Sequence, residues 1–178
     1  MKFFETIDTE TRKRDLQFLV IGGLAVNLYG YSRDTADLDM LICMPQREQW
    51  LGLYFELGYT IYRDASVFIQ LSPPKQGAWP VDLMLVQEKT FATMFAASRE
   101  EDLYGTRSRI PSLEHLIALK LHALKNGRFD RYLKDFLDVE NLILVNRLDI
   151  KSENMRQLFA KYGTVELYDK VSRSLAAE

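Results

Sequence analysis

The order of apolar and polar positions predicts strands and helices in alternation up to about residue 109, and helices alone after it. Short apolar runs typical of strands occur at 17–22, 37–43, 59–63, 67–71, around Asp82 and, as a brief extended piece, near 104–110. Helical spacing occurs at 3–15, from the Gly-Gly pair to Tyr29, at 46–57, at 88–97 and in the tail from about Pro111. This order predicts an α+β fold: a mixed sheet flanked by helices over residues 1–109, then a helical C-terminal part over residues 110–178.

Size and composition narrow the class of protein. With 178 residues, 47% of them hydrophobic, the chain can bury one substantial core with a small helical appendage. The net charge of −2 argues against a general nucleic-acid coat protein, although a local basic patch is compatible with it. The single cysteine, Cys43, lies in a predicted buried strand and is expected to stay reduced, which favours a cytoplasmic location. No signal-peptide pattern or run of membrane-spanning length occurs, so we expect no membrane partner.

Asp37 and Asp39 stand at the start of an apolar stretch that continues through Leu41 and Ile42. Side chains two residues apart on a strand point to the same side, so these two carboxylates are expected to lie together. Neighbouring carboxylates repel each other unless a cation lies between them, and oxygen ligands of this kind suit Mg²⁺. The alternative is that the pair is solvated or caps a turn at the strand edge.

Gly22 and Gly23 follow the strand-like run FLVI and open a short helical pattern. Glycine lets a backbone approach a phosphate, and the first amides of a helix attract anions. The simpler interpretation is a tight strand-to-helix turn. Together with the acidic pair, however, the two glycines indicate a metal-dependent nucleotide site.

The motifs follow one another in a fixed order: a strand, Gly-Gly, a short helix, Arg-Asp-Thr and then Asp-x-Asp. This order resembles the signature of the nucleotidyltransferase superfamily, which has a polymerase-β-like fold. The form Arg-x-Thr-x-Asp-Leu-Asp is similar to the branch that includes the AbiEii-type toxins of toxin–antitoxin systems. The resemblance implies that Asp37 and Asp39 hold Mg²⁺, in a two-metal site, on the triphosphate of an NTP. It also implies a nucleotide-binding role for Gly22, Gly23, Arg33 and Thr35.

The resemblance requires a third carboxylate on a neighbouring strand, and Asp82 is the candidate. Asp82 lies near the start of the mostly apolar run WPVDLMLV, where an acid is costly unless it is paired or metal-bound. By resemblance, Asp82 accepts the proton of the attacking hydroxyl or shares a metal ion. The alternative is a solvated acid at the end of the strand.

Lys120 occupies an unusual position in the predicted helix that follows Pro111. Placed at 100° per residue, it falls in the middle of the apolar face formed by Leu113, Leu116, Ile117, Leu121 and Leu124. Such an ammonium group must find a partner or extend along the surface to water. The resemblance implies the former, because related transferases carry a lysine here that reaches the nucleotide phosphates.

The next helix is predicted to have an apolar face made of Phe129, Tyr132, Leu133, Phe136, Leu137 and Ile143. Asp135 lies outside that face. It belongs to the sequence motif Arg-x-x-Lys-Asp-x-x-Asp, which resembles a segment of the AbiEii-type branch. It is expected in the nucleotide site, orienting Lys120 or Arg128, although a surface ion pair explains it equally well. The basic residues between 120 and 134 form either a solvated face or a contact for RNA backbone.

Three functions are compatible with these motifs. The first is an enzyme, a nucleotidyltransferase that moves a nucleoside monophosphate from an NTP to an RNA end such as that of tRNA, as a toxin with an antitoxin protein as partner. The second is an adenylyltransferase that modifies a small molecule such as an aminoglycoside. The third is a catalytically silent module that binds a nucleotide or a protein. Residues 146–178 carry no motif that assigns them a role.

Overall fold

The computed structural model describes residues 2–127 and 131–176, and the chain divides into two compact units. The first unit comprises Met1–Ala25 and Asp34–Ser112, and the second comprises Val26–Arg33 and Leu113–Glu178. Residues 26–33 therefore belong with the C-terminal helices, although they precede the acidic pair in sequence. Hydrophobic side chains are buried in both units.

The first unit is built on a five-stranded mixed sheet with the strand order β1-β2-β5-β4-β3. The strands are β1 (Phe18–Val20), β2 (Leu38–Cys43), β3 (Thr60–Ala65), β4 (Phe68–Ser72) and β5 (Val81–Val86). The two central strands β2 and β5 run parallel, whereas the other neighbouring pairs are antiparallel. The parallel pairing brings the start of β2 next to the start of β5.

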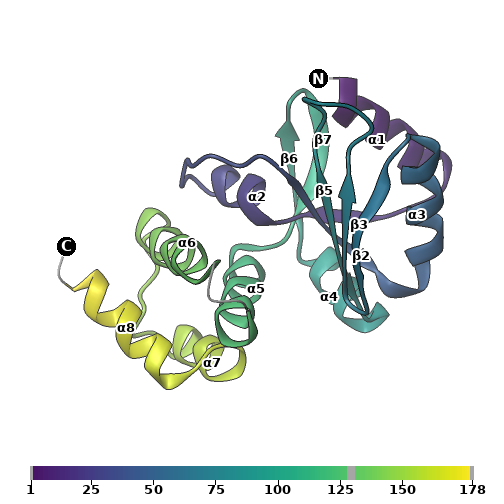
Figure 1. Cartoon of the computed structure of the whole chain (residues 1–178). Coiled ribbons are helices and arrows are strands. Elements are labelled where there is room, and N and C mark those ends of the chain that lie inside the picture. Colours follow the sequence, from purple (N-terminus) through teal and green to yellow (C-terminus); the bar gives the residue numbers. More distant parts are fainter. Residues whose placement is uncertain (1, 128–130, 177–178) are drawn as a thin grey trace. The chain divides into compact units, whose positions relative to one another are not determined.

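Helices pack beside this sheet (Figure 1). They are α1 (Lys2–Lys13), α2 (Gly22–Leu28), whose second half belongs to the other unit, α3 (Arg47–Glu56) after the short turn η1 (Met44–Gln46), and α4 (Glu88–Ala96). Tyr54 of α3 donates its hydroxyl proton to Met40 Sδ at 3.0 Å, so Met40 faces α3. Alternate strand residues point to opposite faces, so Asp39 lies on the face of β2 opposite to Met40.

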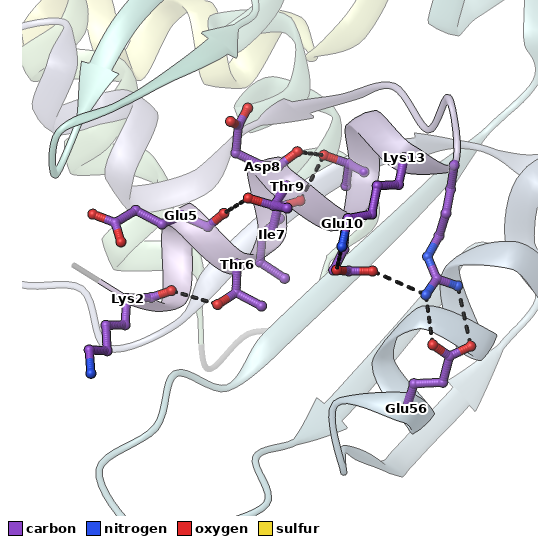
Figure 2. A network of polar contacts seen from close by, with 11 residues as sticks. Lys2, Glu5, Thr6, Ile7, Asp8, Thr9, Glu10, Lys13 and Glu56 are labelled. Carbon is purple, nitrogen blue, oxygen red and sulfur yellow. Dashed lines mark hydrogen bonds and ion pairs between the residues drawn. The ribbon is translucent and has the colours of Figure 1, made fainter.

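Polar contacts join α1 to the end of α3 (Figure 2). The guanidinium of Arg14 donates to both carboxylate oxygens of Glu56, at 2.6 and 3.3 Å, and to Glu10 at 3.2 Å. This contact holds the pKa of the Glu56 carboxyl below its usual value. Phe4 and Ile7 are buried on the inner side of α1. Apolar burial therefore supplies most of the attachment of α1, because exposed ion pairs contribute little to stability.

The segment before the helical tail is a β-hairpin, β6 (Arg99–Leu103) and β7 (Thr106–Ile110). The sequence predicted one brief extended piece near 104–110, so the prediction missed β6. Four of the five residues of β6 are charged, and the strand therefore lacks the alternating apolar pattern by which strands are recognised. Tyr104 and Gly105 both have positive φ, as a two-residue hairpin turn requires.

The described residues of the second unit form the helices α5 (Leu113–Asn126), α6 (Tyr132–Val145), α7 (Glu153–Tyr162) and α8 (Val165–Leu175), besides the end of α2. α5 packs against α6 and α7, and α8 packs against the same two helices (Figure 1). Ser152 and Thr164 cap the starts of α7 and α8 by accepting hydrogen bonds from backbone amides. The predicted α+β class, a mixed sheet with helices followed by a helical part, is confirmed.

The predicted apolar face of α6 is correct at Ile143, which is buried, but wrong for the leucines. Leu133 is 68% exposed and Leu137 is 38% exposed, while Phe129 lies outside the described residues. The other buried residues of α6 were not in the predicted face: Asp135, Asp138, Val139, Glu140 and Leu142. Aspartate can occupy a buried face only when it is paired, and the cationic partners come from elsewhere in the chain.

In the described parts of the chain, none of the helices has the length and apolar character needed to cross a bilayer.

Candidate active site

Three carboxylates from two strands meet at one place in the first unit. Asp37, Asp39 and Asp82 each offer one oxygen, and these oxygens all lie within 4.8 Å of one another. Asp39 and Asp82 are buried, at 8% and 6% exposure, and Asp37 is half-buried. The structure therefore brings together the three acids that the sequence had assigned to a metal site.

Strand register explains this convergence. Asp39 is directly opposite Asp82 in the parallel pairing of β2 with β5, so both side chains point to the same face. Asp37 was expected on the strand but immediately precedes it, because β2 begins at Leu38. The backbone is already anchored there, since Leu38 N donates to Pro80 O at 2.9 Å.

The neighbouring polar contacts orient two of the acids. Thr35 Oγ1 donates to Asp37 Oδ1 at 3.0 Å. The side-chain amide of Gln70, on β4, donates to Asp82 Oδ1 and Oδ2 at 3.3 and 3.2 Å. Gln70 was not predicted from the sequence. The available signal was a polar residue between the apolar Ile69 and Leu71, which alternation places on the face of β4 opposite to theirs.

The charges of the cluster favour a bound cation. Carboxylate oxygens within 4.8 Å of one another repel when they are ionised, and the cluster contains three such pairs. A divalent cation converts this repulsion into attraction. The donor set consists of carboxylate oxygens alone, which fits a hard cation such as Mg²⁺ better than a soft one.

Gly22 is required by the close approach of Asp39. Its φ is +61°, and a Cβ added there would lie 1.8 Å from Asp39 Oδ2. Ile21 N also donates to Asp39 O at 2.9 Å, which fixes this turn against β2. Gly22 and Gly23 are the first two residues of α2, so the predicted strand-to-helix turn is present and lies against the acidic cluster.

Lys120 and Arg33 meet two aspartates inside the second unit. Lys120 is 5% exposed, and its Nζ donates to Asp135 Oδ1 and to Asp138 Oδ2, each at 2.7 Å. Arg33 contacts both oxygens of Asp138 in a bidentate pair at 2.6 and 2.9 Å. Two cations and two anions are thus gathered at a site where single charges would be costly.

This cluster decides two alternatives that the sequence left open. Lys120 does not extend along the surface to water, because its ammonium group is buried and paired. The surface ion pair considered for Asp135 is wrong, because this residue is 5% exposed and binds Lys120. Arg128, the other partner considered for Asp135, lies outside the described residues. Asp138 contacts both Lys120 and Arg33 but was not among the candidate residues. It is the last acid of the motif Arg-x-x-Lys-Asp-x-x-Asp.

Comparison with known proteins identifies the fold. No family model and no curated protein sequence matches the chain. Among solved structures, the antibiotic-resistance factor ANT(2'')-Ia matches with a TM-score of 0.66 and 15% identity, over 99% of this chain and 97% of that one. The lincosamide antibiotic adenylyltransferase LnuA matches with a TM-score of 0.57 and 16% identity, over 80% of this chain and 95% of that one.

A third match is an antigenic nucleotidyltransferase-like protein from Paracoccidioides brasiliensis, with a TM-score of 0.58 and 14% identity, over 99% of this chain and 92% of that one. At these identities the likeness shows the fold. The chain therefore has a nucleotidyltransferase-like fold that carries an Asp-x-Asp pair and a third aspartate, as the sequence pattern predicted.

Proposed function

We propose that this protein is a metal-dependent nucleotidyltransferase that moves a nucleoside monophosphate from an NTP to a hydroxyl group of an acceptor. The observation that carries the proposal is the meeting of Asp37, Asp39 and Asp82 within 4.8 Å, beside the glycine turn, on a nucleotidyltransferase-like fold. A site made only of carboxylates binds hard divalent cations and repels anionic substrates without them. The donor set therefore supports Mg²⁺ as the proposed cofactor.

In this reaction the acceptor oxygen forms a bond to the α-phosphorus of the NTP, and the bond from that phosphorus to the bridging oxygen breaks. Pyrophosphate leaves with that electron pair. Asp82 takes the proton from the attacking hydroxyl, and Asp37, Asp39 and Asp82 are the residues that would hold Mg²⁺. Bound Mg²⁺ supplies charge stabilisation for the attacking and leaving oxygens. Gln70 donates to both oxygens of Asp82 and so fixes the direction of its carboxylate.

We assign the triphosphate to the turn at Gly22 and Gly23. The absence of a side chain at Gly22 leaves Asp39 Oδ2 in direct reach of a group that lies over the turn. Thr35, which donates to Asp37, keeps that carboxylate directed toward the cluster, which is how it contributes to nucleotide binding. This assignment predicts that NTP and divalent cation bind together and more weakly apart.

We further propose that Lys120 contacts the phosphates. An ammonium group has three N–H donors, and the contacts with Asp135 and Asp138 use two of them. Asp135 then fixes the position of the ammonium group. Arg33 acts indirectly in this role: it pairs with Asp138 and neutralises the charge of that carboxylate. A positive charge at the phosphates stabilises the leaving pyrophosphate.

The acceptor that we propose is an RNA end, such as that of tRNA, and such an activity is compatible with a toxin that an antitoxin protein restrains. The second candidate is a small-molecule acceptor such as an aminoglycoside. It is favoured by a specific observation, the fold likeness to ANT(2'')-Ia over 99% of this chain and 97% of that one. A catalytically silent binding module is the remaining alternative.

The test is to incubate the pure protein with each α-labelled NTP, Mg²⁺, and either total tRNA or a panel of aminoglycosides. Labelled acceptor and pyrophosphate should form in equal amounts with one acceptor class. Asp82→Asn should abolish both products, whereas Asp102→Asn, the same change on the exposed hairpin, should not. Binding of NTP without any transfer would support the silent module, and absence of NTP binding would refute the proposal altogether.

A further inference from the structure

A row of polar side chains crosses the sheet from the acidic cluster to its outer edge. Asp39 is opposite Asp82, Asp82 is opposite Gln70, and Gln70 is opposite Arg63. Residues directly opposite each other on neighbouring strands point to the same face, so the row lies on the face opposite to Met40 and α3. The candidate site therefore continues from β2 and β5 over β4 to β3.

Arg63, at the end of this row, is exposed and lies on the edge strand. Within residues 2–25 and 34–112 it is the one arginine without an ion pair. The others, each paired with an acid, are Arg12, Arg14, Arg47, Arg99, Arg107 and Arg109. Its positive charge is thus available to an anion. Gln70, which lies opposite Arg63 in the row, offers a side-chain amide beside that charge.

A second row on the same face is apolar. Phe68 and Met84 are opposite each other and stand two residues from Gln70 and Asp82, so they share the face of the polar row. Both are half-buried. A partly exposed aromatic ring beside a cation is the combination on which unstacked nucleotide bases lie, because every base has a π-face and every nucleotide a phosphate.

We propose that Gln70, Arg63 and Phe68 form the acceptor site and that it receives a single-stranded RNA end. The inference rests on the proposed function, which puts the phosphates of the NTP at the Gly22 side of Asp39 and the acceptor hydroxyl at Asp82. The rest of the acceptor then lies over β4 and β3. Two strand spacings, about 10 Å in all, separate the backbones at Asp82 and Arg63. About three stacked nucleotides span that length at about 3.4 Å each.

The sign of the charge separates this acceptor from the alternative. Arg63 attracts a phosphate and repels a polycationic aminoglycoside. An arginine on an edge strand also serves to prevent pairing with other chains, and any charged residue can do that. The variant Arg63→Glu keeps a charge at the edge while reversing its sign, so it distinguishes the two roles.

The experiment measures binding of a short 5'-labelled single-stranded RNA of mixed sequence by fluorescence anisotropy, without NTP, at several salt concentrations. Arg63→Glu should weaken binding about tenfold or more, and should reduce the slope of log affinity against log salt by about 0.7, the value of one phosphate contact on a single strand. Arg107→Glu, the same change at an exposed strand position outside the row, is the matched control and should bind as the wild type does.

The same proteins are titrated with NTP and Mn²⁺, and with an aminoglycoside panel. Wild-type affinity of Arg63→Glu for RNA would overturn the acceptor site, as would the absence of RNA binding by the wild type or binding of aminoglycosides in its place. Loss of RNA binding in Arg63→Glu with unchanged binding of NTP supports it. A wild type that binds RNA through Arg63 but binds no NTP would refute the nucleotidyl transfer while leaving the RNA surface intact.

Discussion

Replacing Gly22 with alanine tests whether the glycine turn serves the acidic cluster. The new Cβ would lie 1.8 Å from Asp39 Oδ2 and 2.4 Å from its Cγ, far inside van der Waals contact. The turn cannot relax freely, because Ile21 N is bound to Asp39 O and β2 is buried over its whole length. The carboxylate of Asp39 must therefore turn away from Asp37 and Asp82.

Two costs add up in this variant. A non-glycine residue at φ +61° is disfavoured by about 1–2 kcal/mol. Overpacking against Asp39 adds about 1–3 kcal/mol. The free energy of unfolding should thus fall by about 2–5 kcal/mol, a large share of the total of a domain, which is typically about 5–15 kcal/mol. Displacement of one of three ligands should also weaken Mn²⁺ binding by about 10- to 100-fold.

The matched control is Gly77→Ala. Gly77 has φ +81°, but a Cβ there meets nothing within 4 Å. Its substitution should therefore cost only the backbone term, about 1–2 kcal/mol, and leave Mn²⁺ affinity unchanged. Urea denaturation gives the stabilities and titration calorimetry with MnCl₂ gives the affinities. If Gly22→Ala loses no more stability than Gly77→Ala and binds Mn²⁺ normally, the link between the turn and the cluster is refuted.

Three further predictions concern the acids, the buried lysine and the pH range. Asp39→Ala should keep the fold, seen as an unchanged circular dichroism spectrum, but abolish nucleotidyl transfer, since it removes a metal ligand; residual turnover within tenfold of the wild type would contradict this role. Lys120→Met should lower the free energy of unfolding by about 3–5 kcal/mol, because it leaves Asp135 and Asp138 short of a partner, and should reduce turnover by about two to three orders of magnitude. An unchanged urea midpoint would contradict a stabilising role for the contacts of Lys120 with the two aspartates. Burial raises the pKa of Tyr59 to about 12, while its hydroxyl donates to Trp79 O at 2.8 Å. Because the pKa is raised in the folded state, the stabilisation is complete below about pH 10 and is lost as the pH rises toward 12. Tyr59→Phe should therefore be less sensitive than the wild type over that range in denaturation curves, and equal slopes would exclude the effect.

The sequence by itself determined the acidic pair and most of the elements that carry it. Asp37 and Asp39 stand two residues apart at the start of an apolar run. On a strand this spacing directs both side chains to the same side, and that does not depend on residues far away in the sequence. Gly22 and Gly23 mark the turn because backbone preference is also local. Asp82 could be identified because an acid in an apolar strand is unusual. It lies beside Asp39 because β5, which carries it, pairs in parallel with β2.

Only the tertiary structure decided which distant side chains meet. Gln70 reaches Asp82 because β4 pairs with β5 in one particular register, and a shift by one residue would turn it to the other face. Helical periodicity misassigned the buried side of α6, because Asp135 and Asp138 obtain their stability from Lys120 and Arg33 rather than from apolar contact. The charged strand β6 escaped prediction because its partner β7 supplies its hydrogen bonds. Pairing between segments far apart in sequence leaves no periodic trace in either one, and that is why it had to be seen in three dimensions.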